Sequence, residues 1–101
     1  MRILLLAPAL LLAMTLPVLA IGTMERACLS SNRQASSRSL CNCIQQAADR
    51  TLSASDQRTA ATFFKDPDKA QDIRRSDRSS HEAFWERYTR FGALAQKYCA
   101  R

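Results

Sequence analysis

The sequence predicts a small all-α domain of four to five helices, stapled by two disulfides, after an N-terminal signal peptide. Beyond residue 20 the chain has no valine and one proline and is rich in alanine, arginine and glutamine, a composition that favours helix over strand. Apolar residues recur there at spacings of three and four, the period of an amphipathic helix. The same segment holds all four cysteines. We expect residues 21–101 to form one domain.

Residues 1–20 have the pattern of a secretory signal peptide. A single cation, Arg2, precedes an apolar run, and Pro17 breaks that run shortly before Ala20. We expect cleavage after Ala20, or alternatively after Gly22, and a periplasmic or secreted protein with no stable membrane span. An uncleaved anchor is the competing interpretation, because the run is long enough to cross a thin membrane or to cross at a tilt.

The chain is basic, with a formal net charge of +6, and loss of Arg2 with the signal peptide leaves +5. In a cytosolic protein this excess would suggest nucleic acid. Export instead favours an acidic envelope protein or an anionic polymer as partner, and we do not expect the protein to bind nucleic acid. Arg74, Arg75 and Arg78 form the cationic segment that we single out. Neighbouring acids such as Asp72 make an ordinary solvated surface the competing interpretation.

The first two helices are expected over residues 24–30 and 38–52, with a serine-rich loop between them. The first would place Met24 and Cys28 on one side. The second carries apolar residues at helical spacing: Leu40, Ile44, Ala47, Ala48 and Leu52.

Two start signals predict the third and fourth helices. Ser53 and Asp56 have the spacing of a capping box, and the helix that follows would carry Phe63-Phe64. Asp66 would cap a short fourth helix that begins at Pro67, where a missing amide hydrogen costs nothing, and ends near residue 76.

The longest helix is expected from Ser79, three residues before Glu82 in a second capping-box pattern, to about residue 100. His81 would be an exposed residue of its first turn. Gly92 lowers helix propensity, so we expect a close helix crossing there. An apolar seam typical of a buried face runs along this helix: Phe84, Tyr88, Phe91, Ala95 and Tyr98.

We expect Cys28, Cys41, Cys43 and Cys99 all to be in disulfides, because a small exported domain with few large apolar side chains needs crosslinks. Cys41 and Cys43 point about 200° apart on a helix, so each must pair with one of the other two. The preferred pairs are Cys28–Cys41 and Cys43–Cys99, since Cys43 lies on the side of Leu40 that should face the long aromatic helix. The pairs Cys28–Cys43 and Cys41–Cys99 are the alternative.

Other chemistry has weaker support in the sequence. Cys41-Asn42-Cys43 could hold a soft metal such as Cu(I), with Cys28 or Cys99 as further ligands, whereas zinc sites and redox dithiols usually have other spacings. The chain has no Gly-rich phosphate loop, nucleophile elbow or His-Glu-x-x-His motif. We therefore expect no catalytic residue, no cofactor and no resident metal. The prediction is a noncatalytic envelope interaction module with a cationic surface, and Cu(I) handling is the alternative.

Three segments between an early Cys28 and a late Cys99 give the chain a resemblance to known proteins. They are Leu40-Cys41-Asn42-Cys43-Ile44-Gln45, Phe63-Phe64-Lys65-Asp66-Pro67 and Phe84-Trp85-Glu86-Arg87-Tyr88. The chain resembles a group of small exported four-cysteine helical proteins of Gram-negative bacteria that have no established function. Some of them bear the label "arginine transporter". A single removable apolar segment cannot form a translocation path, so the label implies at most a soluble accessory role in amino-acid uptake.

Overall fold

A computed structural model describes residues 21–31 and 36–99 of the chain. Residues 1–20, which hold the predicted signal peptide, lie outside the described residues. Within the described ranges the chain forms five α-helices and one short 3-10 helix, and no strand. The prediction of an all-α fold with two disulfides is confirmed.

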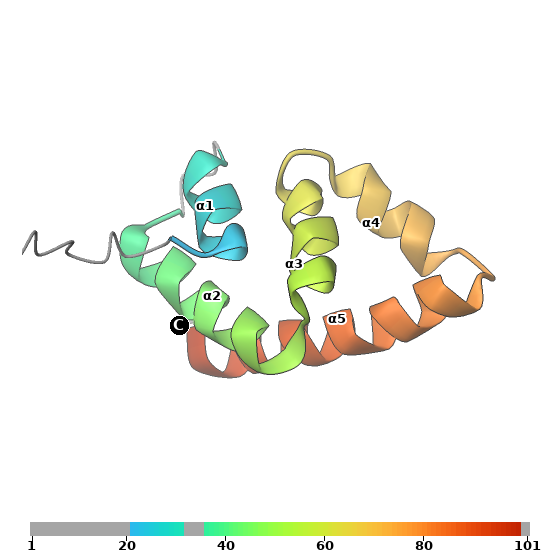
Figure 1. Ribbon diagram of the computed structural model, residues 1–101. Coiled ribbons are helices and arrows are strands. Elements are labelled where there is room, and N and C mark those ends of the chain that lie inside the picture. The colour runs from blue at the N-terminus through green and yellow to red at the C-terminus, as the bar shows by residue number, and fades with distance from the viewer. Residues whose placement is uncertain (1–20, 32–35, 100–101) are drawn as a thin grey trace, which may run out of the picture.

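Helices α2 and α5 form the base of the fold, and α1, α3 and α4 all lie on one side of this base (Figure 1). The last helix, α5, packs against α2 through its C-terminal half and against α4 through its N-terminal half. Helix α1 lies between α2 and α3. The elements in chain order are α1 (Thr23–Ser30), α2 (Arg38–Thr51), α3 (Ala54–Ala61), η1 (Thr62–Phe64), α4 (Pro67–Arg74) and α5 (Ser79–Cys99).

Side-chain caps begin two of the helices. The Ser37 hydroxyl accepts a hydrogen bond from the Leu40 backbone N–H and starts α2. Ser53 and Asp56 form the predicted capping box at α3, in which each side chain accepts from the other residue's backbone N–H. Each cap satisfies N–H groups that have no partner within the helix.

Three predicted details of the helix boundaries are wrong. Helix α3 ends at Ala61, and Phe63-Phe64 lies in the tighter η1 turn. Asp66 occupies the position before Pro67 but makes no capping hydrogen bond, so Pro67 alone marks the start of α4, which ends at Arg74.

The predicted capping box at α5 is also wrong. The helix begins at Ser79 as expected, but Ser79 is its first helical residue rather than its cap, because the Arg78 carbonyl accepts from the Glu82 N–H. Ser76 organises this turn instead: its hydroxyl accepts from the Arg78 N–H and is 2.7 Å from Nδ1 of His81. His81 is half-buried rather than exposed as predicted, because it folds back on Ser76.

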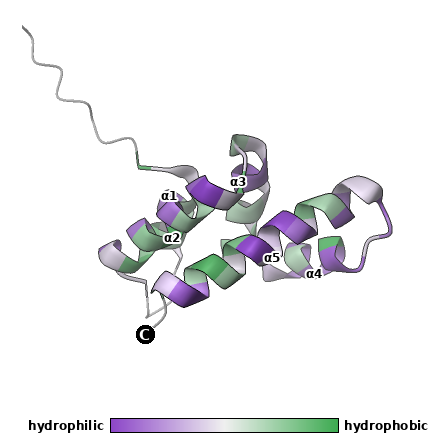
Figure 2. Cartoon of the chain, turned by 90° about the horizontal axis from the view of Figure 1, so that it is seen from below, coloured by the Kyte–Doolittle hydropathy of each residue, from purple (hydrophilic) through white to green (hydrophobic). Residues whose placement is uncertain are grey.

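The buried core is formed by residues of α1, α2, α3, η1 and α5, and α4 packs against it only through the half-buried Ala70 and Ile73. Phe63 contacts the rings of Phe84 and Tyr88 edge-on, at centroid distances of 6.0 and 5.2 Å, so η1 is fastened to α5 by aromatic packing. Hydrophilic and hydrophobic residues alternate along the ribbon of α5 in Figure 2, as expected when the two kinds lie on different faces of an amphipathic helix. The buried cluster comprises Met24, Ala47, Ala48, Leu52, Ala60, Phe63, Phe84 and Phe91.

The predicted seam of α5 is shorter than expected. Tyr98 is 63% exposed, because the last turns of α5 extend past the aromatic cluster. Gly92 is not at a close crossing, since a Cβ built there meets nothing within 4 Å. A close approach occurs at Gly22 instead, where a Cβ would collide with the side chain of Gln45.

Candidate functional site

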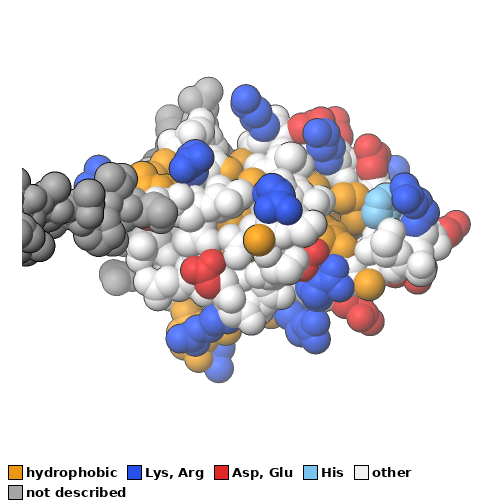
Figure 3. Space-filling model, viewed as in Figure 1, with side chains coloured by type: hydrophobic (Ala, Val, Ile, Leu, Met, Phe, Trp, Pro, Cys, Tyr) orange, Lys and Arg blue, Asp and Glu red, His pale blue; other side chains and the backbone are white. Residues whose placement is uncertain are grey.

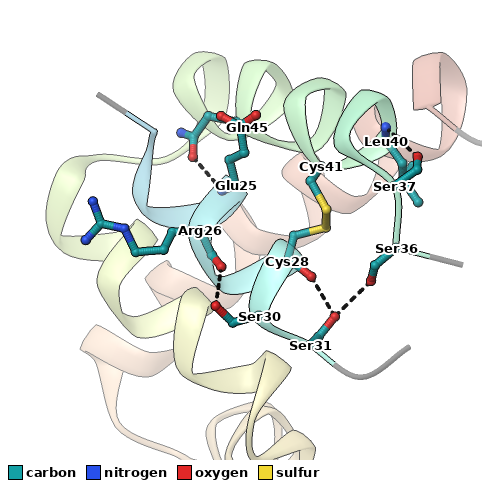
Figure 4. The surroundings of a disulfide bond; sticks show 10 residues. All are labelled: Glu25, Arg26, Cys28, Ser30, Ser31, Ser36, Ser37, Leu40, Cys41 and Gln45. Atoms are coloured by element: carbon teal, nitrogen blue, oxygen red, sulfur yellow. Dashed lines mark hydrogen bonds between the residues drawn. A yellow bond between two sulfur atoms is a disulfide. The ribbon is translucent and has the colours of Figure 1, made fainter. Parts of the chain in front are cut away.

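The first disulfide joins α1 to the start of α2 and is buried. Cys28 and Cys41 are 2% and 0% exposed, and their Cα atoms are 5.5 Å apart. The Ser31 hydroxyl lies next to this bridge (Figure 4). It donates a hydrogen bond to the Cys28 carbonyl at 2.7 Å. The bridge therefore fixes the end of α1 against α2.

The second disulfide joins Cys43 of α2 to Cys99 at the end of α5, so the structure has the pairing favoured above. Both cysteines are half-buried and border a shallow cleft of about 220 Å³ beside Tyr98 and Leu94. Solvent thus reaches this bridge more easily than the first one.

Cys41 and Cys43 face different partners, as their spacing on one helix requires. All the described cysteines are in disulfides, and the described part of the chain has no group of three or more His, Cys, Asp or Glu residues that could hold a metal ion. Thiolates, which bind soft metals, would form here only on reduction.

A well-formed ion pair ties α3 to α5. Nε and Nη2 of Arg87 donate to the two carboxylate oxygens of Asp56 at 2.6 and 3.0 Å. Asp56 is 7% exposed, and the hydrogen bond from Arg87 holds the pKa of its carboxyl below the ordinary value. The sequence marks Asp56 as a cap, but its partner is 31 residues away and has no sequence signal.

Gln45 is the centre of a buried polar network. Its carbonyl oxygen accepts from the Glu25 N–H at 2.9 Å, and its amide nitrogen donates to Asp49 and Gln57 at 2.7 and 2.8 Å. Gly22 leaves room for this side chain at the start of α1. The network is fully bonded and structural, because it joins α1, α2 and α3.

The predicted cationic segment lies at the end of α4 and in the turn to α5. Arg74, Arg75 and Arg78 are all exposed. Two acids in the same segment, Asp72 and Asp77, are exposed as well. Figure 3 shows Lys and Arg side chains interspersed with Asp and Glu on this view of the surface, with hydrophobic atoms between them.

A groove that the sequence analysis missed separates α1 from η1 and the start of α4. It has a volume of about 590 Å³. Arg26, Lys65 and Lys69 contribute to its lining, together with apolar side chains of both walls. No sequence pattern could have found it, since its two walls are at least 30 residues apart in the chain.

Comparisons of the chain with protein-family models, curated proteins and solved structures find no match. None of the helices within residues 21–31 and 36–99 is both long and apolar enough to cross a membrane.

Proposed function

We propose that the chain is an exported, noncatalytic interaction module that works in the periplasm or outside the cell. The observation that carries this proposal is the oxidation of all the described cysteines to two disulfides. Structural disulfides persist in oxidising compartments and are rare in the cytosol. The leader pattern of residues 1–20 supports the same location.

The start of α1 favours removal of the leader after Ala20 rather than after Gly22. The Gly22 carbonyl accepts from the Arg26 N–H at 2.9 Å and so closes the first turn. Cleavage after Gly22 would remove that acceptor and place the new ammonium group at Thr23, against the positive end of the helix dipole. The intact mass of the exported protein should therefore correspond to a chain that begins at Ile21. A chain that begins at Thr23 would contradict this reasoning.

We expect the module to bind an acidic envelope protein or an anionic polymer through Arg74, Arg75 and Arg78. Exposed guanidinium groups bind carboxylates and phosphates through paired hydrogen bonds. The two neighbouring acids lower the net charge of residues 72–78 to +1, so recognition rests on the placement of the arginines rather than on total charge.

The test is capture by the oxidised protein of poly-glutamate and of identified components of an envelope extract. A variant with Arg74→Glu, Arg75→Glu and Arg78→Glu should lose capture at least tenfold. The matched control reverses three other exposed arginines, Arg38, Arg50 and Arg90, and should retain it. Equal loss in both variants would show that only net charge matters, and retention in both would remove the cationic segment from the proposal.

Cu(I) handling requires free thiols and is separated from this proposal by one measurement. The native protein should have a mass four hydrogens below that of the reduced chain, as two disulfides require. If the native protein instead has free thiols that bind Cu(I) in stoichiometric amounts, metal handling becomes the better proposal and the interaction module is rejected.

A further inference from the structure

The groove between α1 and η1–α4 has the size and lining of a ligand site. Its volume of about 590 Å³ lies within the usual range for small-molecule sites. One wall is the outer face of α1, from Thr23 to Ser30, and the other is formed by residues 61–69. By the helical rise, the α1 wall is about 10 Å long.

The inner surface of the groove is mainly apolar. Ala27 lines it from α1, and Ala61 and Phe64 line it from the opposite wall; all three are half-buried. Ala61 and Phe64 also pack against the core cluster, so this surface is fixed in place by the fold.

Three hydroxyl groups in the lining already donate to backbone carbonyls of the protein. Ser30 donates to the carbonyl of Arg26 at 2.9 Å and Ser31 to that of Cys28 at 2.7 Å, as Figure 4 shows. Thr62 donates in the same way to the carbonyl of Thr59 at 2.6 Å. An extended peptide in the groove would therefore find few donors for its own backbone, whereas a hydrocarbon chain needs none.

Cations stand on both walls of the groove. Arg26 extends from α1 on the side away from the first disulfide (Figure 4). Lys65 and Lys69 face it from the η1–α4 segment, and all three side chains are exposed. Asp66 is the one acid in the described lining, so the net charge there is +2.

We propose that this groove binds a single-chain amphiphile with an anionic head, of the fatty-acid class. The hydrocarbon chain covers Ala27, Ala61 and Phe64, and the head group lies among Arg26, Lys65 and Lys69. A fully polar anion would leave the apolar surface uncovered, and a neutral lipid would leave the cations unused. A free carboxylate and the phosphate of a lysophospholipid share this chemistry. The site does not depend on Arg74, Arg75 or Arg78, so it stands or falls separately from the proposed function.

The first test is calorimetric titration of the oxidised exported protein with butanoate, hexanoate, octanoate and dodecanoate below their micelle concentrations. The shorter acids are needed because an extended chain of about eight carbons already spans the α1 wall. Affinity should rise about fourfold for each added methylene that the groove buries, and dodecanol should bind at least tenfold more weakly than dodecanoate. Equal affinity for butanoate, hexanoate and octanoate would overturn the proposal, since charge alone would then account for binding. A lysophospholipid of equal chain length distinguishes a phosphate head from a carboxylate.

Variants then locate the site. Lys65→Glu with Lys69→Glu should weaken dodecanoate binding at least tenfold, whereas Arg38→Glu with Arg90→Glu, an equal change of charge elsewhere, should not. Asp66→Asn should strengthen binding up to about fivefold, because it removes a like charge and breaks no cap.

An NMR titration of the unaltered protein gives an answer that does not depend on variant folding. The methyl signals of Ala27 and Ala61 should shift on addition of dodecanoate. Binding without these shifts, or equal weakening by both pairs of charge reversals, would place the ligand elsewhere and refute the site.

Discussion

Removal of the second disulfide, by Cys43→Ala with Cys99→Ala, tests how far crosslinks hold this fold together. The bridge closes a loop with a sequence separation of 56 residues, which is worth about 4 kcal/mol in the chain-entropy account. The first bridge closes a separation of 13 residues and is worth about 3 kcal/mol. The two loops do not overlap in sequence, so the loss of one leaves the entropy of the other unchanged.

The second bridge is the better one to remove, because its cysteines are less buried and the measured change is then due mainly to the lost crosslink. Cys28 and Cys41 are almost fully buried, so alanine there also leaves a cavity, whereas Cys43 and Cys99 are half-buried beside an open cleft. A domain with so few large core residues should be at the low end of the usual 5–15 kcal/mol, so about 4 kcal/mol is a large fraction of its stability. The midpoint of thermal unfolding should fall by about 20 °C.

The assay is urea unfolding followed by circular dichroism. The variant without the second bridge and a variant without the first are each fitted for the free energy of unfolding and its denaturant slope. The Cys43–Cys99 variant should also have a steeper slope, since its unfolded chain is more expanded. A loss of unfolding free energy below about 1 kcal/mol would refute the reasoning, because helix packing would then hold the fold together almost as well without the second bridge. The Cys28→Ala, Cys41→Ala variant serves as the comparison.

Three further substitutions probe local features. Gly92→Ala should stabilise the protein by about 1 kcal/mol in the same urea assay, since its Cβ meets nothing and helix propensity improves; destabilisation would contradict this. Gly22→Ala should destabilise by about 1–3 kcal/mol, because its Cβ displaces Gln45 from its buried hydrogen bonds, and an unchanged midpoint would disprove the close approach. The pKa of Asp56 is lowered in the folded state by Arg87, so the stability that this carboxylate contributes is present above about pH 4 and is lost as pH falls through the folded pKa. Asp56→Asn should therefore flatten the acid side of a plot of unfolding free energy against pH, and parallel curves would refute the assignment.

The helices could be predicted because their signals are local. Ser53 and Asp56 are three residues apart, and Pro67 sits at the first position of α4. For the disulfides, helix geometry excluded only a Cys41–Cys43 bridge, because two positions two residues apart on a helix point in different directions. The choice between the two remaining pairings rested on the expectation that Cys43 lies on the side of its helix that faces the long aromatic helix, and the structure has that pairing.

What could not be predicted depends on contacts between distant segments. Arg87 meets Asp56 across 31 residues, and nothing in either neighbourhood indicates the pair. The periodicity that places Phe84 and Phe91 in the core continues to Tyr98, yet that ring is 63% exposed because it lies past the aromatic cluster, at the edge of the cleft beside α2. The groove between α1 and η1–α4 likewise exists only once two separate segments are placed side by side.

The cysteines pair in the order in which they occur, first with second and third with fourth. A polypeptide that enters an oxidising compartment N-terminus first presents Cys28 and Cys41 together, long before Cys99 arrives. If the chain is exported as proposed, an enzyme that joins successive thiols on arrival would make these bridges directly, without reshuffling by a disulfide isomerase. In such a chain the second bridge would form last, because Cys43 has to wait until Cys99, 56 residues further on, has entered the compartment.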